Sequence, residues 1–264
     1  MSLIAAIGLG WAAMAVAMLA LWAWYRRGGD PGVVDVAWGL GVAALGPWFC
    51  LWAEEGDRTR RWVLAGLVVA WGVRLSGHIA RRLGRLSGDG RYHTLSEAWG
   101  PRAPWYFLGF FQLQATWSVL FALPVLLAAT NPAPWPQWSD LVGLGTWLVA
   151  VAGEAIADRQ LQRFRENPAN RGQVCQTGLW RYSRHPNYFC EWLHWWAYVA
   201  CSGLRPVTLW GLLGPLAMWW FLNRVTGIPP TEAQSLKSRG EAYRRYQQTT
   251  SRFFPWPPRA ESTP

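Results

Sequence analysis

The stretch from Leu3 to Tyr25, LIAAIGLGWAAMAVAMLALWAWY, contains no charged side chain. A helix needs about 20 consecutive apolar residues to cross the hydrocarbon core of a bilayer, and this stretch is long enough. No basic residue precedes it, so we expect a retained membrane span and not a cleaved signal peptide. This first segment therefore predicts a membrane protein.

Six further apolar runs follow the first one. Twenty-two tryptophans accompany them, and Trp favours the interface between a membrane and water. The sequence predicts an all-α integral membrane bundle of about seven transmembrane helices in one domain, residues 1–264, with 226–264 as a cytoplasmic tail and lid. The six runs are Val33–Ala53, Trp62–Ala80, Pro104–Ala129, Leu141–Asp158, Tyr188–Leu204 and Val207–Asn223.

The distribution of positive charge predicts the orientation of these spans. Of the 25 Lys and Arg residues, 20 fall in alternate loops that would share one side, 4 fall on the other side, and Arg74 lies within a run. The loops rich in Lys and Arg face the cytoplasm, so we expect the N-terminus outside and the C-terminus inside. The net charge of +10 then reflects topology and lipid attraction, which argues against nucleic-acid binding.

Ionisable residues in several runs share helical faces, although each costs about 2.5–3.5 kcal/mol within a membrane. Helices bring residues three or four positions apart to one face. Such clustering in the cytoplasmic halves of several spans predicts a cavity that opens inward. The first face comprises Glu154, Asp158 and Arg165, and the second comprises Asn187, Glu191, His194 and Trp195.

Two other runs carry candidate groups with ordinary alternatives. Asp35 lies near the cytoplasmic end of the second run, where it could simply pair with Arg26 or Arg27. Arg74 and His78 lie one turn apart in the third run and could be structural. His194 alone is more typical of a hydrogen-bonded histidine inside a bundle. The four cysteines show no CxxC spacing, so we expect no metal site.

The most informative loop joins the fifth and sixth runs and reads Gly178-Leu179-Trp180-Arg181-Tyr182-Ser183-Arg184-His185-Pro186-Asn187-Tyr188-Phe189-Cys190-Glu191. Pro186 suits the first turn of a helix. Arg181, Arg184 and His185 gather charge at that helix N-terminus, which itself favours anions. A ligand with phosphate groups would suit this end. The alternative is a basic loop that lies on anionic lipid.

The tail after the last run predicts a short helix. Thr231 and Gln234 form a capping-box pattern after two prolines, and we expect the helix to begin there. Tyr243, Tyr246 and an aromatic segment around Phe253 follow. The tail is either an amphipathic surface helix with an aromatic anchor or a lid whose Arg and Tyr side chains close over a cofactor.

These motifs together resemble the bacterial steroid 5-alpha-reductase-like membrane family, which is distant kin of the isoprenylcysteine carboxyl methyltransferases. The resemblance implies seven helices, an external N-terminus, a cytoplasmic cavity for NADPH and a location in a bacterial inner membrane. It implies hydride transfer to an activated carbon–carbon double bond of a lipid. The segments that carry it are Gly153-Glu154-x3-Asp158-x-Gln160-x3-Phe164, the loop quoted above, Tyr243-x2-Tyr246-x2-Thr249-x3-Phe253-x-Pro255, Asp35-x2-Trp38-Gly39, Arg74-Leu75 and Arg91-Tyr92.

The resemblance also implies roles for particular residues. Asp35 and Arg74, with His78 and Tyr92, would polarise the substrate carbonyl and stabilise the enolate. The chain lacks the Gln-Glu pair of steroid-reducing members, which leaves the lipid open, and Cys190 stands where the family usually has glycine. The cofactor contacts would be Glu154, Asp158, Arg165, Arg181, Tyr182, Arg184, His185, Asn187, Tyr188, Glu191, Trp195, Tyr243 and Tyr246.

Two other function classes fit parts of the pattern. A membrane methyltransferase would share the Arg-His-Pro-x-Tyr turn and the paired tyrosines, and would bind S-adenosylmethionine. A transporter or lipid-binding scaffold would need polar groups across the membrane, whereas the outer halves of the runs are apolar. No GxGxxG pattern follows a strand, so an NADPH site would not be of the Rossmann type. We expect a monomer whose partners are membrane lipids and a lipid-like substrate that enters from the bilayer.

Overall fold

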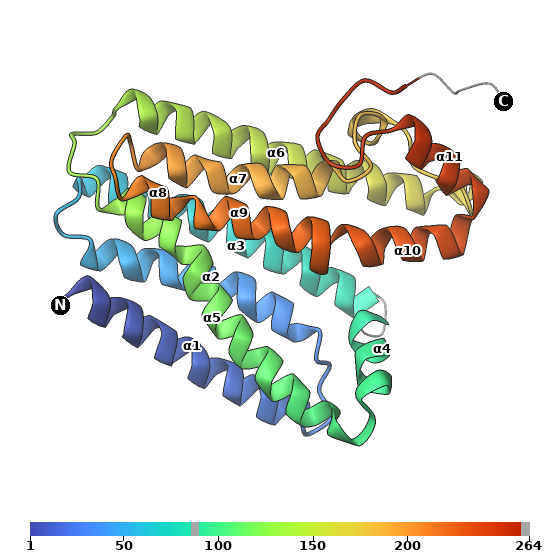
Figure 1. The fold of residues 1–264 in the computed structure, drawn as a ribbon, viewed down its shortest axis with the longest axis horizontal. Coiled ribbons are helices and arrows are strands. Elements are labelled where there is room, and N and C mark those ends of the chain that lie inside the picture. Colours follow the sequence, from blue (N-terminus) through green and yellow to red (C-terminus); the bar gives the residue numbers. More distant parts are fainter. Residues whose placement is uncertain (86–89, 260–264) are drawn as a thin grey trace. The chain divides into compact units, whose positions relative to one another are not determined.

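The computed structural model describes residues 1–85 and 90–259, and the regular structure within these ranges is helical (Figure 1). Contacts divide the chain into two compact units. Unit 1 comprises Met1–Asp140 and Cys201–Gly211, and unit 2 comprises Leu141–Ala200 and Leu212–Pro264. The helical class predicted from the sequence is therefore confirmed.

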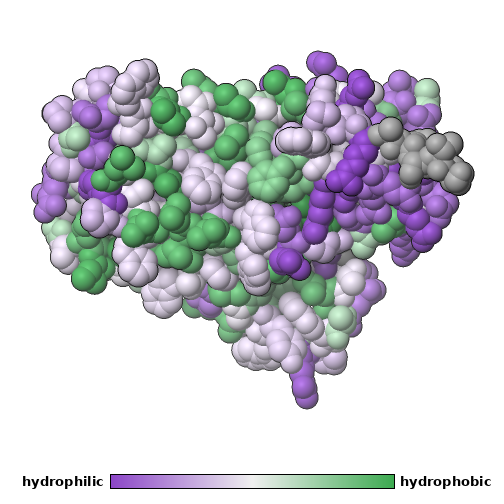
Figure 2. Space-filling view, turned by 45° about the horizontal axis from the view of Figure 1, so that its top comes forward, coloured by the Kyte–Doolittle hydropathy of each residue, from purple (hydrophilic) through white to green (hydrophobic). Residues whose placement is uncertain are grey.

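Among the described residues, five helices are long and apolar enough to cross a membrane, which confirms a multi-pass membrane protein. Figure 2 shows patches of hydrophobic side chains on the molecular surface. The seven-helix count and the orientation remain predictions. The five helices are α1 (Leu3–Tyr25), α2 (Val33–Trp52), α3 (Arg58–Arg85), α5 (Ala103–Ala129) and α6 (Trp138–Glu166).

In unit 1, α2 and α3 pack closely through small residues. A Cβ atom added at Gly72 would lie 2.7 Å from the carbonyl oxygen of Gly39, and one added at Gly39 would lie 2.5 Å from Ser76 Oγ. The Ser76 hydroxyl donates to the carbonyl of Val36 at 3.1 Å. Small residues and interhelical hydrogen bonds are how helices associate where lipid removes the hydrophobic driving force.

A buried ion pair fixes one end of unit 1. The Arg60 guanidinium donates to both carboxylate oxygens of Asp140, at 2.7 and 2.6 Å, and both side chains are completely buried. Its third nitrogen donates at 2.7 Å to the carbonyls of Asn131 and Ala133. Arg60 is one of the four basic residues that the charge distribution assigns to the outer side, and charge alone does not predict that its side chain is buried.

The last two predicted runs differ most from expectation. The sixth forms α7, Pro186–Cys201, a helix of 16 residues. The seventh is interrupted, and forms α8 (Thr208–Gly211), α9 (Leu213–Trp220) and a π-helical turn (Phe221–Val225). Pro215 lies within the first turn of α9, where its missing N–H removes no helical hydrogen bond.

Two short helices correct the sequence analysis. The helix α10 runs from Ile228 to Arg239 and begins before Thr231, whose hydroxyl donates to the carbonyl of Gly227 at 2.8 Å. The predicted capping box is therefore wrong, because the two prolines fit inside the first turn. The helix α4, Gly90–Trp99, lies in a segment that the sequence analysis treated as a loop. The tail continues as α11, Glu241–Thr249.

Candidate functional site

The loop that precedes α7, residues 178–185, is anchored to α6 of unit 2 by its first residues. Gly178 has a φ of +60°, a conformation that favours glycine, and an added Cβ would lie 2.4 Å from the Gln160 side chain. The Gln160 carbonyl oxygen accepts from the backbone N–H of Leu179 at 2.9 Å. The Trp180 indole is buried against Ala157 and donates to its carbonyl at 3.0 Å. These contacts explain why the loop begins with Gly-Leu-Trp.

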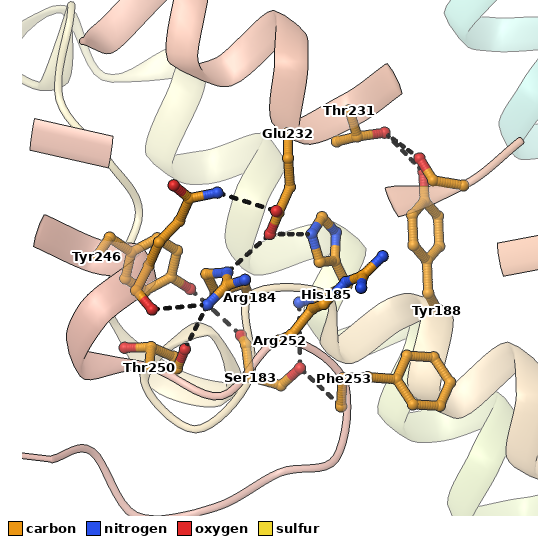
Figure 3. Close-up of polar contacts among 12 residues, drawn as sticks. Ser183, Arg184, His185, Tyr188, Thr231, Glu232, Tyr246, Thr250, Arg252 and Phe253 are labelled. Carbon is orange, nitrogen blue, oxygen red and sulfur yellow. Dashed lines mark hydrogen bonds and ion pairs between the residues drawn. The ribbon is translucent and has the colours of Figure 1, made fainter. Parts of the chain in front are cut away.

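Arg184 lies at the centre of a buried polar network (Figure 3). Its Nε donates to Oε1 of Glu232, on α10, at 2.7 Å. Its Nη1 donates to the carbonyls of Gln247 and Thr250 at 2.9 and 2.7 Å. The residue is only 8% exposed, so this arginine joins the loop to α10 and to the end of α11.

His185 shares the Glu232 carboxylate with Arg184. Its Nε2 lies 3.2 Å from Oε1 of Glu232, and its ring stacks on Tyr188 with an interplanar angle of 4° (Figure 3). Burial lowers the pKa of His185, which keeps the imidazole neutral near pH 7. Burial alone would raise the pKa of Glu232, but hydrogen bonds from His185 and Arg184 lower it to about 2. Glu232 is therefore ionised throughout the physiological range.

The chain after α11, residues 250–259, crosses the loop and is called the strap below. Its backbone accepts a hydrogen bond from the Ser183 hydroxyl at Phe253, at 2.9 Å. The N–H of Trp256 donates to the carbonyl of Tyr182 at 2.9 Å. The Tyr246 hydroxyl, on α11, donates to the carbonyls of Trp180 and Ser183. The tail thus covers the loop, and a lid over a cofactor stays a prediction.

The polar faces predicted on the fifth and sixth runs do meet within unit 2. The Asn187 amide, one residue into α7, donates to Oδ1 of Asp158 on α6 at 3.2 Å. One turn further along α7, Oε1 of Glu191 accepts from the Trp195 indole at 3.3 Å. Glu154 lies one turn from Asp158 on α6 and is buried. The structure therefore brings carboxylates and an amide together along two adjacent helices.

The same two helices come close together at Gly153 of α6 and Cys190 of α7. A Cβ atom added at Gly153 would lie 2.8 Å from Sγ of Cys190. The glycine on α6 thus provides the space that the cysteine on α7 occupies. The substitution of Cys for the expected glycine is accommodated by packing in this chain.

The predicted cofactor residues outside the polar face of α6 and α7 fall into two groups. Arg165, Arg181 and Tyr182 are exposed, and Arg181 lines a cavity of about 300 Å³ together with Gln176 and Thr249. The remaining predicted residues of the loop and the tail are buried or form hydrogen bonds with other parts of the chain. This geometry favours a structural role for Arg184, His185, Tyr188, Tyr243 and Tyr246 over contact with a phosphate.

The sequence analysis missed Glu232, which organises the network. Its Oε2 also accepts from the Gln247 side chain at 2.9 Å. A buried arginine requires a carboxylate or carbonyl partner. The acidic residue after the Pro229-Pro230 pair was the available signal, but the pairing is set by tertiary structure.

The residues predicted to polarise a substrate lie in unit 1. The Tyr92 hydroxyl donates to Oδ1 of Asp35 at 2.8 Å, and Arg91 donates to Oδ2 at 2.9 Å. Asp35 on α2 is therefore paired with Arg91 of α4, where the sequence offered Arg26 or Arg27 as partners. Arg74 and His78 lie one turn apart on α3, as predicted.

Comparisons with known proteins place the chain in a family. A family model described as "Protein of unknown function (DUF1295)" matches residues 21–250. An uncharacterised protein of Schizosaccharomyces pombe is 24% identical over 225 residues, which cover 74% of this chain and 63% of the yeast protein. The chain thus spans less than two thirds of that relative's length. No solved structure matches it significantly. The matched range includes every residue discussed above from Asp35 to Tyr246, and the chain belongs to the DUF1295 family.

Proposed function

We propose that this protein is an NADPH-dependent reductase that transfers hydride to an activated carbon–carbon double bond of a membrane-soluble lipid. The resemblance to the steroid 5-alpha-reductase-like family motivates this reaction class. The observation that carries the proposal is the Asp158–Asn187 hydrogen bond, 3.2 Å long, which joins the two polar faces of α6 and α7. We infer seven membrane spans, a cytoplasmic site and a location in a bacterial inner membrane.

The chemistry of this face suits a nucleotide. Asn187 offers an amide, while Asp158 and Glu191 offer acceptors for ribose hydroxyls or a carboxamide. Arg181 is exposed beside a cavity, and the described residues provide its side chain with no hydrogen-bond partner, which suits a phosphate. Arg184 does not fit that role, because its guanidinium is already bonded to Glu232 and two carbonyls. The bound cofactor would supply a hydride, and the residues of this face would orient it and exclude water.

The proposed reaction also requires a donor at the substrate carbonyl. Tyr92 is 5% exposed, and its hydroxyl is held by the Asp35 carboxylate. The phenol has one proton, so during hydride addition it would redirect this proton from Asp35 to the enone oxygen, where it would stabilise the developing negative charge. Arg91 holds the second carboxylate oxygen and keeps Asp35 in place. Tyr92 is thus the donor that we propose, with Asp35 as its positioning residue.

Two substitutions test the cofactor assignment. Asn187→Ala and Glu191→Ala should each weaken NADPH binding by about 10- to 100-fold, since hydrogen bonds to charged groups contribute about 1.5–3 kcal/mol. Gln162→Ala is a matched control, because Gln162 also donates an amide hydrogen bond to a carboxylate, Glu166, but on the exposed surface of α6. The NADPH affinity of the Gln162→Ala variant should equal that of the wild type. Unchanged affinity in both test variants would refute this placement.

A separate assay tests the reaction. Tyr92→Phe should reduce NADPH-dependent reduction of lipid enones by about 100-fold while leaving NADPH affinity within twofold, since a fixed donor contributes about 2.7–4 kcal/mol to such steps. Turnover with S-adenosylmethionine instead would establish the methyltransferase alternative. Failure of the protein to bind either ligand would favour a non-enzymatic scaffold.

A further inference from the structure

A second cavity lies on the strap and does not include the polar face of α6 and α7. Its volume is about 260 Å³, and its lining includes Gln248, Ser251, Arg252, Trp256 and Arg259. Drug-sized ligands occupy cavities of about 300–1,000 Å³, so this cavity suits a smaller group. It could hold several water molecules, each of which needs about 30 Å³, or one polar headgroup.

The charge of the cavity is positive. Three arginines line it, and the described residues of the lining include no carboxylate. Glu232 neutralises Arg184, so within the part of the chain that the structure describes the charges without an acidic partner are those of Arg252 and Arg259. Arg252 uses one nitrogen to donate to the carbonyl of Asn223 at 2.7 Å, and the described residues take up no other donor of its side chain. The ligand should therefore be an anion that accepts several hydrogen bonds.

The strap holds this cavity in a fixed shape. The N–H of Arg259 donates to the carbonyl of Thr249 at 2.8 Å, which closes the strap into a loop. Phe253 is buried, and Phe254 packs against Phe189 and Trp192 with ring centroids 5.9 and 5.6 Å apart. A preorganised loop binds a ligand without a large loss of conformational entropy.

The aromatic residues of the strap indicate where the cavity lies relative to lipid. Phe189 and Trp192 belong to the first two turns of α7, at the cytoplasmic start of a predicted span. Phe254 is 53% exposed and Trp256 is 69% exposed. Trp favours the headgroup level of a bilayer, and arginine beside it attracts anionic lipid. These aromatic and basic residues would suit a cavity at the level of lipid phosphates.

We propose that the strap cavity binds the phosphate of an anionic phospholipid headgroup, with Arg252 and Arg259 as its ligands. The strap that covers the loop would then be held down by lipid. This site does not include the polar face of α6 and α7, but its lining shares Thr249 and Thr250 with the cavity beside Arg181. Its function does not depend on the reductase proposal.

The test is thermal stabilisation of the detergent-purified full chain by dihexanoyl phosphatidylglycerol, dihexanoyl phosphatidylcholine and inorganic phosphate. We expect stabilisation by phosphatidylglycerol at concentrations where the other two have no effect. Arg252→Gln combined with Arg259→Gln should weaken the apparent affinity about 30-fold, from about fivefold for each arginine near an anionic headgroup. The single variant Arg259→Gln should show about fivefold, and it perturbs folding least because its side chain has no hydrogen bond within the described residues.

Arg244→Gln combined with Arg245→Gln is the matched control, since it removes the same charge from the exposed face of α11 outside the cavity. This control should respond to phosphatidylglycerol as the wild type does. An equal loss in the control would mean a diffuse charge effect and would overturn the site. Equal stabilisation by inorganic phosphate would show that the cavity binds free phosphate and would overturn the proposal of a lipid ligand. A loss of NADPH affinity in the Arg252 and Arg259 variant would assign the cavity to the cofactor and would also overturn the proposal.

Discussion

Replacement of Glu232 by Gln tests the network that ties the loop to the tail. The Glu232 carboxylate accepts from Arg184 at 2.7 Å and from Gln247 at 2.9 Å, and it lies 3.2 Å from His185. Gln keeps the shape of the side chain but removes its charge, so the ion pair is lost and Arg184 remains buried. A hydrogen bond to a charged group contributes about 1.5–3 kcal/mol. With the Glu232 side chain 15% exposed, we expect a loss of about 2 kcal/mol.

The loss should depend on pH with a defined sign. Burial would raise the pKa of Glu232, but His185 and Arg184 lower it from 4.5 to about 2 in the folded protein. A carboxyl group with a lowered folded-state pKa stabilises fully above its unfolded value and loses that contribution as the pH falls. The difference in stability between wild type and Glu232→Gln should therefore be constant above about pH 4.5 and should disappear towards pH 2.

The assay is thermal unfolding of the purified protein, followed by its intrinsic tryptophan fluorescence. A loss of about 2 kcal/mol lowers the Tm by about 4–8 °C for a chain of this size. Glu241→Gln is the matched control, because Arg244 also donates to Glu241 at 2.7 Å but both side chains are more than 60% exposed. Exposed pairs contribute little, so its shift should stay below about 2 °C. Equal shifts in the two variants would refute the proposed role of the buried network.

Three further substitutions test the packing of each unit by the same Tm measurement. Gly178→Ala should lower stability by about 1–2 kcal/mol, because its φ is +60°, and a wild-type Tm would show that the loop adopts another backbone conformation. Gly153→Ala should lower it by about 1–3 kcal/mol through a clash 2.8 Å from Sγ of Cys190, and adding Cys190→Gly should restore most of the loss; a lack of restoration would exclude this contact. Asp140→Ala should lower it by about 3–5 kcal/mol by leaving the Arg60 charge buried, and a loss below about 1 kcal/mol would contradict the buried pair.

The sequence predicted the long helices well because the apolar runs that form them end at polar or charged residues. The helix α1 has the predicted bounds, since the apolar run ends where Arg26 and Arg27 begin. The helix α4 was missed because its ten residues are too few for the spacing of Tyr92, Leu95 and Trp99 to stand out among polar neighbours. The start of α10 was misplaced because a capping pattern at Thr231 competed with prolines that also begin helices.

The candidate site was predictable in part. The helical spacing predicted polar faces that include Asp158 and Asn187, and in the structure these two side chains form a hydrogen bond of 3.2 Å. The pairing of Arg184 with a carboxylate was not predictable, because a basic residue at a helix N-terminus suits a phosphate and a carboxylate equally. Its partner Glu232 is 48 residues further along the chain, and only the tertiary fold decides that pairing.

The most direct test of the proposed function is thermal stabilisation of the detergent-purified protein by NADPH, NADH and S-adenosylmethionine side by side. A ligand that binds only the folded protein stabilises it by about 2.7 kcal/mol at 100 times its Kd, which corresponds to a Tm increase of about 5–10 °C. We expect this increase with NADPH, its loss in Asn187→Ala, and no shift with S-adenosylmethionine. An increase in Tm with S-adenosylmethionine alone, or no increase with any of the three ligands, would contradict the proposed reductase activity.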